Sequence, residues 1–241
     1  MAQLIFEAVT KFGPVLALLF QAGVLSRFFN SRNRDYPLAI LFSVVLFLLT
    51  LAAYIFDRLN DALPEASTLA GKKAFIFAYS SGDLFMHVLL VALMLQLIRK
   101  TLKSLELNTR VIYLLAALSV LISVSAYTWF GATFDVRVLL RTRQVVSFWM
   151  VLLNLYWWTL LLRRRQLDRR VLLLSAGIGL MMTGQVIGDG MVAFASQQPW
   201  ISISAALIMY GTHFACLYTW YNAFNPSNAL SPAHNPEQSL T

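Results

Sequence analysis

Two ionisable side chains lie one helical turn apart inside a long apolar stretch of the sequence. Asp83 and His87 are spaced i,i+4, so a helix places both on the same face. A carboxylate beside an imidazole favours the protonated ring and fixes its orientation. The pair is therefore a candidate proton-linked switch or ligand-binding pair. The alternative is a polar pair that only holds this helix to its neighbours.

Further polar residues in apolar stretches extend this candidate ligand site; they are Asn154, Gln185, Asp189 and His213. Ionisable groups are costly in lipid and usually face the interior of a helix bundle. Counting from the ends of the apolar stretches places Gln185 at about the depth of Asp83, with Asp189 further out. We expect the six residues to line a small polar pocket, although ordinary interhelical hydrogen bonding would explain them equally well.

The two histidines also allow a second interpretation. His87 and His213 count to a similar depth on two different stretches, and histidine is a common axial ligand of haem iron. The alternative is therefore a haem b site with these two axial ligands. No third ligand for another metal is evident, and the single Cys216 excludes an internal disulfide or a cysteine-based metal site. The leading expectation is a chain without a cofactor.

The composition indicates that these residues are positioned by transmembrane helices. Only 12% of the 241 residues are charged, against about 25% in soluble domains, and the mean hydropathy is +0.66. Continuously apolar runs exclude the alternating strands of a membrane barrel. We predict an all-α bundle of seven transmembrane helices at Leu4–Leu25, Pro37–Phe56, Ala74–Ile98, Val111–Phe130, Val145–Leu162, Val171–Ala193 and Trp200–Phe224.

The chain divides into one transmembrane domain over residues 1–225 and a tail over residues 226–241. The tail is rich in Pro, Ser and Asn, so we predict that it is disordered and cytoplasmic. The first helix is the least certain, because Glu7, Lys11 and Pro14 interrupt it. We expect it to span the membrane only from about Phe12 onward.

Basic residues set the expected orientation. Most loop Lys and Arg residues fall in the first, third and fifth loops, with Arg137, Arg141 and Arg143 assigned to the fourth. The positive-inside rule then places the N-terminus outside and the C-terminus inside a bacterial inner membrane. Because the basic residues cluster between apolar stretches, we attribute the net charge of +8 to membrane topology and not to nucleic-acid binding.

The densest basic run lies in the fifth loop, and its arginines are Arg163, Arg164, Arg165, Arg169 and Arg170. It is a candidate site for anionic lipid headgroups or a cytoplasmic partner, and the alternative is a positive-inside anchor. In the sixth stretch, Gly184 and Gly188 form a small-xxx-small step, with Gly177 on the same side. We expect this side to pack within the bundle, with a homodimer interface as the alternative.

The layout resembles the seven-helix sensor segments at the N-terminus of some bacterial histidine kinases, and stand-alone bacterial seven-helix proteins of unknown function. The matching features are the N-out topology, short loops, the Arg-rich run 141–147, the basic loop 163–170 and the Gly-containing sixth helix. The resemblance implies a sensor or receptor-like role. No kinase or cyclase domain follows the last helix, so we expect any signal to pass to a separate partner protein.

The sequence thus predicts a sensor, receptor-like or accessory membrane protein that binds a small ligand or a partner within the bundle. The alternatives are a haem b-binding subunit of an electron-transfer chain and a small transporter. We expect no enzymatic activity, because no nucleophile is placed with a base and a stabilising group.

Overall fold

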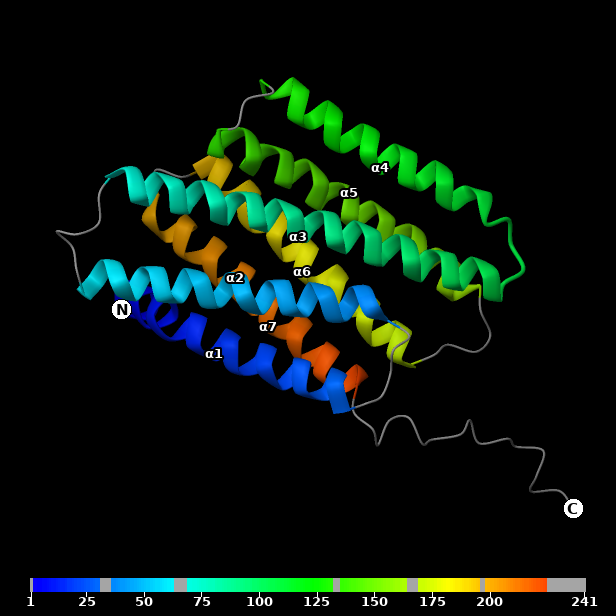
Figure 1. Ribbon diagram of the computed structural model, residues 1–241, viewed down its shortest axis with the longest axis horizontal. Coiled ribbons are helices and arrows are strands. Elements are labelled where there is room, and N and C mark those ends of the chain that lie inside the picture. Colours follow the sequence, from blue (N-terminus) through cyan, green and yellow to red (C-terminus); the bar gives the residue numbers. More distant parts are fainter. Residues whose placement is uncertain are drawn as a thin grey trace, which may run out of the picture.

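The computed structural model describes residues 2–30, 36–62, 69–131, 135–163, 169–195 and 198–224. These residues form helices without strands, so the all-α prediction is confirmed (Figure 1). The seven helices are α1 (Ala2–Asn30), α2 (Pro37–Ala62), α3 (Leu69–Ser104), α4 (Arg110–Trp129), α5 (Val136–Leu162), α6 (Arg169–Ala195) and α7 (Pro199–Ala223).

All seven helices are long and apolar enough to cross a membrane. The span found on α1 covers Phe12–Phe29, and the side chains before Phe12, including Glu7 and Lys11, lie outside the described residues, so the predicted start of this span stays a prediction. Large apolar side chains such as Tyr113 and Leu114 on α4 are exposed, as a lipid-facing surface requires. The chain is therefore a multi-pass membrane protein.

Several helices extend beyond the predicted apolar segments. The largest difference is at α5, which begins at Val136 and not at Val145. The exposed Asp135 caps α5, and its carboxylate accepts a hydrogen bond from the Arg137 backbone N–H. The arginines assigned to the fourth loop therefore belong to the first turns of α5. A hydropathy window misses such turns because their side chains are charged although their backbone is helical.

Six of the helices form a closed ring in the order α1, α2, α3, α5, α6, α7. Helix α4 lies outside this ring, beside α5 and α3, at the edge of the bundle (Figure 1). Helix α5 packs against both α3 and α6, which makes it the link between the two. Because helices alternate in direction, α3 and α5 run parallel and α6 runs antiparallel to both.

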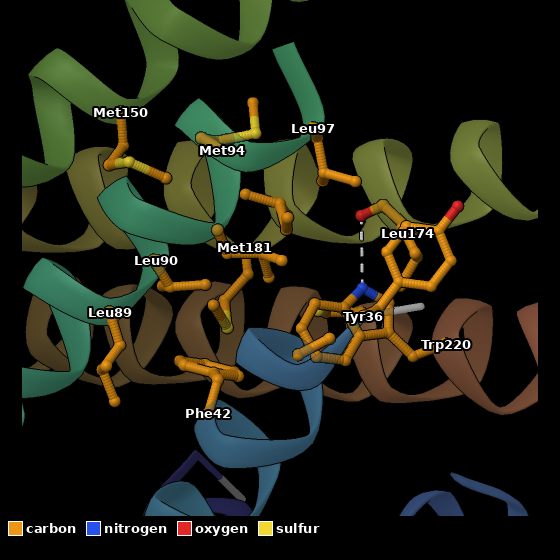
Figure 2. Close-up of a cluster of buried hydrophobic side chains, with 14 of the residues drawn as sticks. Tyr36, Phe42, Leu89, Leu90, Met94, Leu97, Met150, Leu174, Met181 and Trp220 are labelled. Carbon is orange, nitrogen blue, oxygen red and sulfur yellow. Dashed lines mark hydrogen bonds between the residues drawn. The ribbon is translucent and has the colours of Figure 1, made fainter. Parts of the chain in front are cut away.

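The hydrophobic core occupies the half of the ring at which α7 ends, which is the predicted cytoplasmic half. Helix α2 begins in this half, and the last buried residue described on it is Leu46. Helix α3 ends in this half, and the first buried residue described on it is Ser80. In the core, Trp220 donates a hydrogen bond from Nε1 to the Leu174 carbonyl oxygen at 3.2 Å (Figure 2). The opposite half, predicted to face outside, buries few side chains among the residues described.

The glycine side of α6 faces α7, so the predicted packing within the bundle is confirmed. A Cβ at Gly184 would meet the side chain of Thr212, and one at Gly188 would meet Met209. A Cβ at Gly177 would meet Thr219 and Trp220. The small residues therefore allow close approach of the two helices.

We expect Gly184→Ala to lower the free energy of unfolding by about 1–3 kcal/mol, because the added methyl group overpacks the contact with Thr212. Gly190→Ala on the same helix is the matched control, since a Cβ there meets nothing within 4 Å. Thermal unfolding in mild detergent measures the stability of the Gly184→Ala and Gly190→Ala variants. Equal midpoints for the two variants would contradict the close contact of α6 with α7.

Candidate functional site

A largely buried arginine joins three helices in the predicted outer half of the bundle. Arg143 of α5 donates from Nη1 to Asp83 Oδ2 on α3 and from Nη2 to Asp189 Oδ1 on α6, each at 2.7 Å. The exposed fractions of the three side chains are 14%, 20% and 11% for Arg143, Asp83 and Asp189. Such short, charge-assisted bonds are among the stronger polar contacts in proteins. We call Asp83, Arg143 and Asp189 the charge cluster.

His87 lies one turn from Asp83, as the spacing predicts, but its main partner differs from the expected one. Its Nδ1 atom is 2.7 Å from the backbone oxygen of Asp83 and 3.7 Å from the carboxylate Oδ1. A carbonyl oxygen only accepts, so Nδ1 carries a hydrogen and donates it. The ring is therefore oriented by the backbone, because the carboxylate of Asp83 faces Arg143.

On α6, the order of depth differs from the prediction. Asp189 shares Arg143 with Asp83, so Asp189 lies level with Asp83, and Gln185 lies one turn further in. Gln185 donates from Nε2 to Asp189 Oδ2 at 3.3 Å. Counting from the segment ends was wrong here because the outer ends of α3 and α6 do not lie at the same level, so α3 extends further beyond the charge cluster than α6 does.

Asn154 does not join the charge cluster. It lies on the same helix as Arg143, roughly 16 Å further along at 1.5 Å per residue. Its side-chain amide nitrogen lies against Gly179 of α6. Met150 lies between the two residues on α5 and is buried in the apolar core with Met94 and Met181 (Figure 2). Asn154 is thus a separate polar contact between α5 and α6.

His213 belongs to a second polar group on the other side of the ring. Gln21 of α1 donates from Nε2 to Thr50 Oγ1 at 3.1 Å, and the same nitrogen lies 3.5 Å from His213 Nε2 on α7. Because the amide nitrogen is a donor, Nε2 of His213 accepts. This group connects α1, α2 and α7, whereas the charge cluster connects α3, α5 and α6.

The haem hypothesis requires both histidines to face one iron atom. His87 is held to α3 and acted on by Asp83, Arg143 and Asp189, while His213 faces Gln21. The two rings thus belong to different polar groups, one among α3, α5 and α6 and the other among α1, α2 and α7. The arrangement therefore does not favour the haem alternative.

The basic run is only partly described. Arg163 and Arg169 are exposed at the ends of α5 and α6, while Arg164 and Arg165 lie outside the described residues. Arg170 is partly buried and has an interaction partner. Binding of lipid headgroups or a partner by this run stays a prediction.

Arg143 is the residue that sequence reasoning missed. Its partners are 60 and 46 positions away along the chain, so no local spacing connects them. The available signal was Asp135, a good N-cap residue directly before Val136, which would have started the helix earlier and placed Arg143 inside it.

We expect Arg143→Gln to lower the free energy of unfolding by about 3–5 kcal/mol, because it leaves two buried carboxylates without their partner. Arg143→Lys is expected to recover only part of this loss, since an ammonium lacks the two-sided fork of the guanidinium. The exposed Arg137 on the same helix provides the control variant, Arg137→Gln. Thermal unfolding midpoints that are equal for Arg143→Gln and Arg137→Gln would contradict a structural role of the cluster.

Comparisons with known proteins give no relative from which a function could be transferred. No protein-family model, no curated protein and no solved structure matches the chain. The resemblance to bacterial sensor segments therefore stays a prediction, and a function has to be proposed from the charge cluster itself.

Proposed function

We propose that this protein is a sensor or receptor-like membrane protein in which the charge cluster couples a bound ligand to the relative positions of α3, α5 and α6. The observation that carries the proposal is the double bridge of Arg143 to Asp83 and Asp189, at 2.7 Å on each side. One side chain thereby connects three helices. A ligand that changes either bridge changes the contact between two helices.

Two arrangements of similar energy are the physical requirement for such a switch. An ion pair in a medium of low polarity has a steep dependence of energy on distance and on charge. A change in the charge or position of the Asp83 or Asp189 carboxylate therefore alters the preferred position of α5 between α3 and α6. A purely apolar contact would not respond to a charged ligand in this way.

Access to the cluster is expected from the predicted outer half of the bundle. Few side chains are buried there, and Asp83 retains 20% exposure of its side chain. Toward the other end, the apolar core fills the ring. Asp83, His87, Gln185 and Asp189 would form the ligand site together with Arg143, while Asn154 and His213 would not contact the same ligand.

The transporter alternative receives less support. A transport path needs polar groups that continue from one side of the membrane to the other. On α5, Ser147 and Asn154 are separated by the buried Met150, which packs in the apolar core with Met94 and Met181. The methionine layer therefore interrupts the polar residues between the charge cluster and the predicted cytoplasmic end.

Distance measurements between spin labels test the coupling. The labels are placed at Lys73 and Ala193, which are exposed on α3 and α6 at the end of the bundle that is opposite the apolar core, in a Cys216→Ala background in lipid nanodiscs. We expect Asp189→Asn to shift the distance distribution by roughly 1–2 Å or to add a second population, as helix shifts in switching proteins do.

Arg137→Gln serves as the control and is expected to keep the wild-type distribution. A distribution that is unchanged in Asp189→Asn, while the variant remains folded, would show that the cluster only supports the structure. The sensor proposal would then be withdrawn.

A further inference from the structure

The charge cluster contains more acid than base. Two carboxylates, Asp83 and Asp189, share the single guanidinium of Arg143, which stays protonated at any physiological pH. When both carboxylates are ionised, one negative charge is left in excess. An unbalanced charge inside a membrane bundle is costly, and proteins reduce this cost by pairing the charge or neutralising it.

Unpartnered polar atoms lie directly beside the cluster. His87 is 4% exposed and its Nε2 atom has no hydrogen-bond partner, and Ser147 is fully buried with an unpartnered Oγ. Ser147 follows Arg143 by one turn on α5, as His87 follows Asp83 on α3. Because α3 and α5 run parallel, His87 and Ser147 lie at about the same level.

The hydrogen bond of His87 determines which of its nitrogens is available. Nδ1 already donates to the Asp83 carbonyl oxygen, so a neutral ring has its lone pair on Nε2. That lone pair is the buried atom without a partner. Three groups can therefore take up a proton here: the carboxylates of Asp83 and Asp189 and the imidazole of His87.

We propose that the charge cluster and His87 together bind one proton, which balances the excess negative charge. The proton belongs to the group as a whole, since strongly interacting sites titrate jointly. This inference deepens the proposed function, on which it rests, because it identifies the proton as the ligand of the site. A proton requires no cavity of the size that an organic ligand needs.

Charged and titratable groups from several helices surround the site. Asp83, Arg143 and Asp189 act electrostatically on His87. Tyr79, one turn before Asp83 on α3, interacts with Asp83, Arg143 and Tyr210 of α7. Tyr210 in turn interacts with Asp57 at the end of α2. These groups add no second cation to the site, so Arg143 is the main compensating charge.

The test is the pH dependence of thermal unfolding, followed by tryptophan fluorescence of the full-length protein in mild detergent between about pH 6 and pH 8. Because the folded cluster holds a proton that its carboxylates have released in the unfolded state over this window, the contribution of the cluster to stability rises as the pH falls. For each unit by which the pH is lowered, we expect the unfolding midpoint of the wild type to rise by roughly 3 °C more than that of Asp189→Asn, in which the charges already balance.

Asp83→Asn is the second neutralised variant, for the case that Asp189→Asn does not fold. Asp135→Asn, which removes an exposed carboxylate outside the cluster, is expected to keep the wild-type pH dependence. Equal pH dependence in wild type and the neutralised variant would overturn the proposal. A midpoint that rises with sodium chloride relative to choline chloride, without a pH dependence, would also overturn it in favour of a sodium ion.

Failure of this inference is distinguishable from failure of the proposed function. The spin-label distances, compared at a pH above the titration of the wild-type cluster, report whether the charge cluster couples α3 to α6, whichever ligand acts on it. The unfolding measurements report whether that ligand is a proton.

Discussion

A guanidinium group cannot remain unpaired inside a membrane bundle, and this constraint organises the half of the protein that lies opposite the apolar core. Arg143 is charged at all relevant pH values, so α5 has to be placed where carboxylates surround it. Asp83 and Asp189 provide these carboxylates from the two helices on either side. The register of α3, α5 and α6 in this half of the bundle therefore depends on one side chain.

Different interactions maintain the register at the other end. Trp157 of α5 donates a hydrogen bond from Nε1 to Thr101 Oγ1 of α3 at 2.8 Å. Trp220 of α7 similarly donates to the Leu174 carbonyl oxygen of α6. These bonds lie within an apolar core, where an unpaired indole N–H would be costly. The bundle thus has a rigid apolar half and a half in which charges determine the helix contacts.

This division gives the charge cluster a position suited to a switch. The close contact of α6 with α7, made possible by Gly184 and Gly188, keeps these two helices together. Helix α5 is bridged to both α6 and α3 by ion pairs at the level of Arg143, and such contacts change with the charge of their members. The tightly packed core then offers a fixed base against which a change at the cluster alters helix positions.

The sequence by itself determined the architecture of this protein. Apolar stretches of about 20 residues can only satisfy their backbone in lipid as helices, so seven spans followed from composition and length. Spacing alone also determined that Asp83 and His87 share a face, and that Gln185 and Asp189 do, because these pairs lie on single helices.

Only the tertiary structure decided which of these residues meet. Arg143 looked like a loop residue because charged first turns are invisible to a hydropathy pattern. Its partners come from helices far away in the sequence. Asn154 and His213 have the same polar character as the site residues, yet depth along α5 separates Asn154 from the charge cluster, and the ring order places His213 beside α1 and α2. Helix order and register result from packing across the whole bundle, and local sequence does not contain them.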